Sequence, residues 1–105
     1  MQEEVSRILI RVTLIPANDD EACAYGVIVP YSRDIKRFSL PSPALHYAYG
    51  YANAFRGTKI DCTIRADLSI IHESSFSFQS KSKSYKDGQR EARTDIERLT
   101  TIGYI

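Results

Sequence analysis

The stretch from Ser42 to Gly57 constrains the fold most, because it has the features of a complete amphipathic helix. Ser42 and Pro43 predict the first turn, since a serine side chain can cap a free backbone N–H and proline is favoured at the first helical position. Gly57 is typical of the left-handed residue that follows a helix. Small and aromatic residues recur at intervals of three and four, which predicts a face that packs on a sheet. This face consists of Ala44, Tyr47, Ala48, Tyr51, Ala52 and Phe55.

Alternating polar and apolar residues predict the strands of that sheet. Residues 7–15 and 23–31 alternate on either side of a turn-forming run at 16–22, which predicts an antiparallel hairpin. The longest alternation covers residues 60–70 and predicts a strand with one packed and one solvated face. Whether this alternation forms one strand or two stays open, although its unbroken phase favours one. A returning strand is expected at 75–80.

Residues 31–42 have no regular pattern and are interpreted as a loop that leads into the first helix. A second helix is predicted from about residue 84 to Gly103, because a narrow apolar stripe repeats there at helical spacing. The stripe consists of Tyr85, Gly88, Ala92, Ile96 and Leu99. The expected fold is a single α+β domain over residues 1–105, in the order ββαββα. It has an antiparallel sheet of about four strands, with two helices packed on one face.

The composition excludes several classes of protein. Hydrophobic residues make up 43 % and charged residues 26 % of the chain, which is typical of a globular domain. The formal net charge of +1 gives no overall signature of nucleic-acid binding. No apolar run approaches the roughly 20 residues of a membrane span, so no membrane partner is expected. Cys23 and Cys62 fall on the apolar side of predicted strands, which favours buried, reduced thiols in the cytoplasm.

The sequence gives little support for catalysis. His46 and His72 are the only histidines, and neither has a cysteine or carboxylate at a metal-ligand spacing. The chain also lacks a nucleophile elbow and a glycine-rich phosphate loop. We therefore predict a protein that is not an enzyme and that uses no cofactor or metal. A small enzyme with a site assembled from scattered residues is one alternative.

The tyrosine content favours a protein partner. The chain has seven tyrosines and no tryptophan, and tyrosine is enriched where protein surfaces meet. We predict a small protein that binds a protein partner stoichiometrically, such as a phage- or plasmid-encoded inhibitor of a host system. Open sheet edges also favour self-association as a homo-oligomer. The predicted contact residues on the outer helix face are His46, Tyr49, Asn53 and Arg56, and those in the loop are Tyr31, Arg33, Lys36 and Arg37.

A basic stretch at residues 81–93 supports a second alternative, which is binding to the backbone of RNA or DNA. Lysine and arginine side chains cluster there at the start of the second predicted helix, opposed only by Asp87 and Glu91. The free N–H groups of a helix N-terminus, together with nearby cations, can hold a phosphate. The residues concerned are Lys81, Lys83, Lys86, Arg90 and Arg93.

Overall fold

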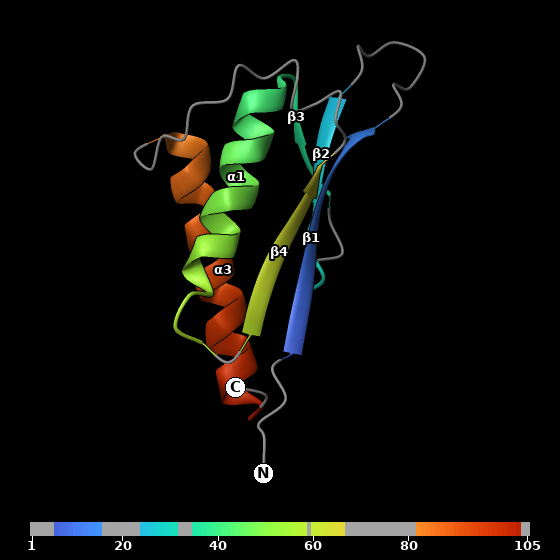
Figure 1. Cartoon of the computed structure of the whole chain (residues 1–105). Coiled ribbons are helices and arrows are strands. Elements are labelled where there is room, and N and C mark those ends of the chain that lie inside the picture. Colours follow the sequence, from blue (N-terminus) through green and yellow to red (C-terminus); the bar gives the residue numbers. More distant parts are fainter. Residues whose placement is uncertain (1–5, 16–23, 32–34, 59, 67–81, 104–105) are drawn as a thin grey trace.

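The computed structural model describes residues 6–15, 24–31, 35–58, 60–66 and 82–103 (Figure 1). In this part of the chain a four-stranded sheet is accompanied by two helices, so the architecture is α+β, as predicted. The elements are β1 (Ser6–Ile15), β2 (Ala24–Ile28), β3 (Lys36–Phe38), α1 (Pro41–Ala54), β4 (Ile60–Ala66) and α3 (Lys83–Thr101).

The sheet has the strand order β3-β2-β1-β4 and is mixed rather than fully antiparallel. β2 pairs with β1 and with β3 in the antiparallel sense, whereas β4 pairs with β1 in the parallel sense. The expectation of a fully antiparallel sheet is therefore wrong at this last pair. α1 returns the chain to the end of the sheet where β1 begins, so β4 starts beside β1 and runs in the same direction (Figure 1). Two parallel neighbours need such a long crossover connection.

The short strand β3 lies within the segment that was predicted as a loop. Lys36–Phe38 pairs with β2, so the prediction of a loop over 31–42 is wrong at these residues. The ring of Phe38 lies 5.6 Å, centroid to centroid, from that of Tyr47 on α1. Three residues are too few to produce a recognisable alternation in a sequence. The strand predicted at 75–80 and the end of the long alternation, beyond Ala66, lie outside the described residues.

The first helix begins one residue earlier than the predicted cap. Leu40 is the N-cap residue, in an extended conformation and without a side-chain hydrogen bond, so Ser42 as the N-cap is wrong. Pro41 opens the helix and Pro43 occupies its third position, where a cap would normally find a backbone N–H donor. Proline has no such donor, so among the first three residues of the helix only Ser42 has a backbone N–H that a cap could satisfy. Gly57 has a φ of 85°, the left-handed conformation predicted for it.

The second helix is capped by its own sequence. The backbone N–H of Tyr85 donates to the side chain of Ser82 at 3.1 Å, which satisfies one free donor of the first turn. Gly103 follows the helix with a φ of 80°. The predicted start and end of this helix are thus confirmed to within about two residues.

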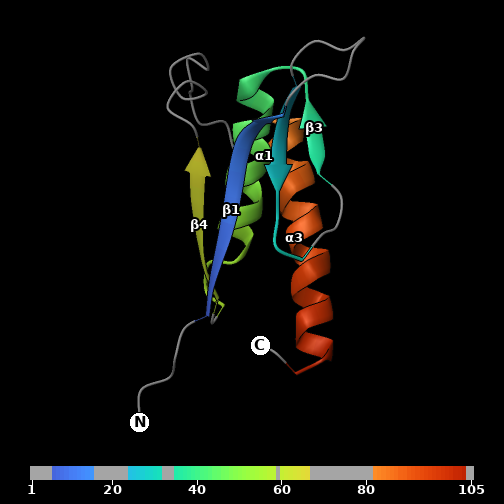
Figure 2. The same ribbon diagram turned by 90° about the vertical axis from the view of Figure 1, so that its right-hand side faces the viewer.

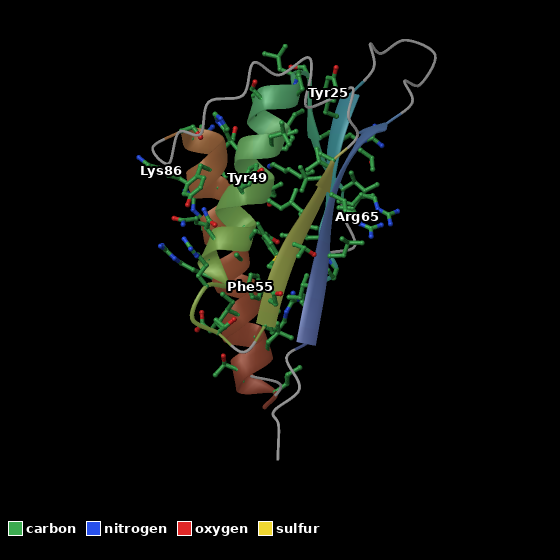
Figure 3. The ribbon with its side chains drawn as sticks, in the orientation of Figure 1. Tyr25, Tyr49, Phe55, Arg65 and Lys86 are labelled. Atoms are coloured by element: carbon green, nitrogen blue, oxygen red, sulfur yellow. The ribbon has the colours of Figure 1, made fainter. Side chains whose placement is uncertain are left out.

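The strand side chains alternate between two environments. On the side that faces the helices, Ile8, Ile10 and Val12 are at most 2 % exposed. On the opposite side the side chains of Arg11 and Arg65 are exposed, and Arg65 points away from the helices (Figure 3). Both helices lie on the same side of the sheet (Figures 1 and 2). The predicted division of the 60–66 segment into a packed and a solvated face is therefore confirmed.

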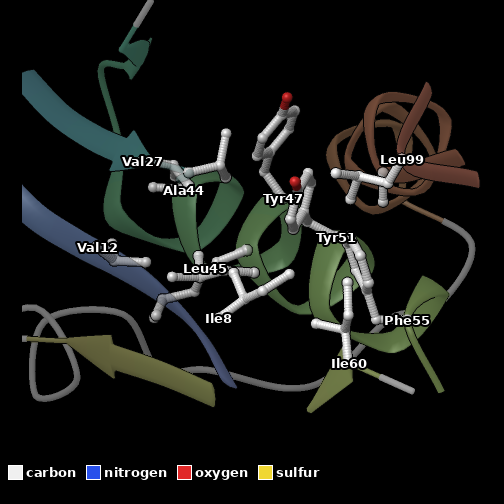
Figure 4. Packing of buried hydrophobic residues seen from close by; sticks show 14 residues of the cluster. Ile8, Val12, Val27, Ala44, Leu45, Tyr47, Tyr51, Phe55, Ile60 and Leu99 are labelled. Atoms are coloured by element: carbon white, nitrogen blue, oxygen red, sulfur yellow. The ribbon is translucent and has the colours of Figure 1, made fainter. Parts of the chain in front are cut away.

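α1 lies between the sheet and α3 and supplies more buried hydrophobic residues to the core than any other described element (Figure 4). Its predicted apolar face is confirmed, because all members except the half-buried Ala52 are at most 5 % exposed. α1 and α3 cross in direct backbone contact at two glycines. A Cβ atom on Gly50 would overlap the carbonyl oxygen of Tyr85, and one on Gly88 would overlap that of Tyr47. Only glycine fits at either position, and this fixes how closely the two helices approach.

Candidate functional site

Asp95 on α3 is a charged residue buried in the helix contact, with 1 % of its surface exposed. The hydroxyl of Tyr51 donates to Asp95 Oδ2 at 2.7 Å, and Arg98 Nη2 donates to Asp95 Oδ1 at 2.6 Å. Burial and the hydrogen bond to Asp95 both raise the pKa of Tyr51, so the phenol stays protonated and acts as the donor. Because each carboxylate oxygen has a donor, this cluster ties α1 to α3 and offers no free acid or base to a substrate.

Asp95 is not part of the apolar stripe predicted for this helix, which contains Ile96 instead. Ile96 is half-buried, whereas Asp95 occupies a fully buried position. A carboxylate is not expected in an apolar stripe unless it is paired. The spacing nevertheless contains the signal, since Asp95 lies three residues after Ala92 and four before Leu99.

Histidine and cysteine do not form a reactive centre in the described part of the chain. His46 is half-buried on α1, and no group of three or more metal-binding side chains is found among the described residues. Cys62 is a free thiol, and burial, with a smaller contribution from Asp61, raises its pKa to about 12. It is therefore protonated and a poor nucleophile at neutral pH. His72 and Cys23 lie outside the described residues.

The outer face predicted on α1 adjoins α3. Asn53 Nδ2 donates to the hydroxyl of Tyr85 at 2.9 Å, and Gln89 Nε2 donates to the same oxygen at 3.3 Å. Asn53 is thus half-buried and engaged between the helices, while Tyr49 is 36 % exposed and Arg56 is exposed. Of the predicted partner-binding residues of α1, the structure thus brings Asn53 against α3, the helix that carries the predicted basic residues.

Four basic residues lie along one exposed side of α3. They are spaced by three, four and three positions, and each is exposed. We call this surface the basic helix face, and it consists of Lys83, Lys86, Arg90 and Arg93. A surface depression of about 380 Å³ runs along it. Lys81 lies outside the described residues.

The other side of the molecule presents the uncovered face of the sheet. Leu9 and Ile28 are each 38 % exposed there. In the sheet register Arg11 pairs with Ile28 on one side and with Arg65 on the other. We call this surface the sheet face, and it consists of Leu9, Arg11, Ile28, Pro30, Tyr31, Arg37 and Arg65. The sequence contained a signal for it, since Leu9 interrupts the polar phase of its strand.

The second predicted patch borders this sheet face. Tyr31 lines a depression of about 360 Å³ together with Leu9, Ile28 and Pro30. Arg37 pairs with Gly26 across the edge of the sheet, and Lys36 is exposed beside it. The backbone oxygen of Tyr31 accepts from Arg98 Nη2 at 3.3 Å, which ties this edge to α3. Arg33 lies outside the described residues.

Comparison of the chain with models of protein families, with curated proteins and with solved structures found no match. Among the described residues, neither helix has the length and apolar character needed to cross a membrane.

Proposed function

We propose that this chain is a non-enzymatic binding domain that acts stoichiometrically on a protein partner and contacts it through the sheet face. The observation that carries the proposal is the pair of exposed aliphatic side chains, Leu9 and Ile28, at the centre of an uncovered sheet. No helix or strand of the described chain packs on this side (Figures 1 and 2). Exposed apolar residues that gather around one depression are typical of interaction surfaces.

The arrangement of charge around these residues supports the same function. Protein interfaces commonly have an apolar centre, and arginine is enriched in them. Here Arg11 stands next to Ile28, Arg65 stands next to Arg11, and Arg37 lies at the edge of the sheet. Arg11 lines the depression together with Leu9 and Ile28, and the register places Arg37 and Arg65 on the same side of the sheet.

The partner segment that fits this surface has an apolar side chain with acidic residues around it. The register places the like charges of Arg11 and Arg65 side by side, an arrangement that destabilises an isolated sheet. Among the described residues whose register places them on this side of the sheet, Asp61 alone is acidic. A carboxylate from a partner between the two guanidinium groups relieves their repulsion and gains charge-assisted hydrogen bonds.

The outer face of α1 is a weaker candidate for the same role. Asn53, one of its four predicted contact residues, is already hydrogen-bonded to Tyr85. Inhibition of a host system by a phage- or plasmid-encoded protein is a role that such a binder fills without catalysis. The free thiol of Cys62 supports action in a reducing compartment such as the cytoplasm.

The test begins with isolation of the partner from cells that contain this protein, followed by calorimetric titration with the purified pair. We expect a fixed stoichiometry and a loss of about 2 kcal/mol or more in the binding free energy for the double variant Leu9→Ser/Ile28→Ser. The matched control is Leu40→Ser, which removes an apolar side chain that is 61 % exposed outside the sheet face.

Two results would contradict the proposal. If Leu9→Ser/Ile28→Ser binds with full affinity while Tyr49→Ala does not, the partner contacts α1 instead of the sheet. If no protein binds at a fixed stoichiometry, the chain does not belong to this functional class.

A further inference from the structure

The basic helix face lies on the side of α3 that is opposite its buried residues. At about 100° per residue, its members fall within one quadrant of the helix, and the buried positions lie across the axis from them. The buried positions are Tyr85, Gly88, Ala92, Asp95 and Leu99. From Lys83 to Arg93 the helix rises about 15 Å, so the four cations form a straight row on a rigid support.

Two acidic residues of α3, Asp87 and Glu91, lie beside this row on the side toward α1. Asp87 is half-buried and pairs loosely with Arg90 at 3.6 Å. Glu91 is also half-buried and lies near Tyr47. Burial, and to a smaller extent the negative charge of Glu91, raises the pKa of the Tyr47 phenol to about 12. The carboxylates of Asp87 and Glu91 thus lie toward α1, whereas the row of cations faces solvent. Glu97 ends the row at its C-terminal side.

We propose that the basic helix face binds the phosphodiester backbone of a nucleic-acid duplex, without reading its base sequence. A straight row of cations matches a duplex, which carries one negative charge per about 1.7 Å of its axis. Gln89 and Thr94 line the depression between the basic residues and add polar groups that can reach phosphate or sugar oxygens.

Two other polyanions fit this surface less well. A helix that lies on an anionic membrane needs apolar side chains beside its cations, and the depression along this face is lined by polar and charged residues alone. A single strand needs aromatic platforms on which its bases stack. No aromatic residue lines the same depression.

This second binding site goes beyond the proposed protein partner and does not depend on it. Lys86 lies on the helical side of the molecule, and Arg65 lies on the far side of the sheet (Figure 3). Variants of one face therefore leave the other intact. Each residue of the basic helix face is exposed, so charge changes there leave the core in place.

The experiment is a fluorescence-anisotropy titration of labelled duplexes of about 20 base pairs, one of DNA and one of RNA, between about 50 and 200 mM salt. We expect the logarithm of the association constant to fall linearly with the logarithm of the salt concentration. The slope should be about −3 to −4, since each of four phosphate contacts contributes about −0.9. Lys86→Gln/Arg90→Gln should reduce affinity at least about tenfold and bring the slope to about −2. The ratio of the two duplex affinities identifies which nucleic acid is preferred.

The matched control is Lys36→Gln/Arg37→Gln, which removes the same net charge at the edge of the sheet. It should keep at least half of the wild-type affinity, because it leaves the row intact. The proposal is overturned if neither duplex binds at low salt, or if the control loses as much affinity as the α3 variant. Stronger binding to a single strand, or to phosphatidylserine vesicles with no binding to either duplex, also overturns it.

Discussion

The hydrogen bond between Tyr51 and Asp95 should be the strongest polar contact between the two helices, and Tyr51→Phe tests it directly. This change removes the hydroxyl and leaves the ring in the core. The two residues are 0 % and 1 % exposed, and their oxygens are 2.7 Å apart. A hydrogen bond to a charged group contributes about 1.5–3 kcal/mol, and a buried acceptor that loses its donor costs a similar amount. We expect Tyr51→Phe to lower the free energy of unfolding by about 2 kcal/mol.

The second partner of the same carboxylate should matter less. Arg98 donates to Asp95 at 2.6 Å, but its own side chain is 58 % exposed. Because the Arg98 side chain lies at the surface, its truncation lets water reach Asp95 Oδ1 and replace the lost donor, whereas nothing replaces the hydroxyl of Tyr51 in the core. We expect Arg98→Ala to cost no more than about 1 kcal/mol, although it also removes the 3.3 Å hydrogen bond to Tyr31. The burial of the donor, rather than the formal charge pair, thus decides which contact stabilises the helix crossing.

Urea unfolding followed by circular dichroism measures these differences at neutral pH. The matched control is Tyr47→Phe, since Tyr47 is also buried on α1 but its hydroxyl makes no hydrogen bond among the described residues. That variant should stay within about 0.5 kcal/mol of the wild type. A double-mutant cycle between Tyr51→Phe and Asp95→Ala should give a coupling of about 1.5–3 kcal/mol. Equal losses for Tyr51→Phe and Tyr47→Phe would refute the reasoning.

Three further predictions follow from particular contacts. Gly88→Ala should lower the stability by about 1–3 kcal/mol in thermal unfolding, because the added Cβ overlaps the carbonyl of Tyr47, and an unchanged melting temperature would contradict the close crossing. The free energy of unfolding should also fall as the pH rises from about 10 to about 12, because the raised pKa of Tyr47 keeps a proton on the folded chain that the unfolded chain has already lost. Urea unfolding at a series of pH values measures this loss, and Tyr47→Phe should make it smaller. In a Cys23→Ser background, Cys62 should react with a thiol reagent at least about tenfold more slowly than free cysteine, since its pKa is about 12, and unfolding should abolish the difference.

The periodic patterns predicted the elements whose environment changes from one side to the other. Val12 and Arg11 alternate as expected across the sheet, and Ala48 lies on the predicted inner face of α1. When one side of a helix or strand is buried, apolar residues recur in the sequence with the period of that element. The period therefore indicates whether the segment is a helix or a strand. Helix ends were predicted nearly as well, because Gly57 and Gly103 adopt a conformation that other residues resist.

The pairing of strands could not be recovered in the same way. A strand has the same alternation whether its neighbour is parallel or antiparallel, so the parallel pairing of β4 with β1 leaves no mark on either segment. The close helix contacts at Gly50 and Gly88 could not be predicted either, since a glycine in a sequence does not indicate which backbone packs against it. For the candidate surfaces, the sequence supplied the members of the basic helix face but not the surroundings of Leu9 and Ile28.

The composition of the chain does not predict either candidate surface, because a low net charge does not show how the charges are distributed in the fold. A total of +1 suggests that charge has no part in recognition, yet the acids of α3 lie at inner or flanking positions. Asp95 is buried against Tyr51, and Glu91 is half-buried toward Tyr47. Each carboxylate placed inside removes a negative charge from the surface without changing the total. Among the described residues the fold therefore presents two basic faces on opposite sides, because α1 separates the sheet from α3.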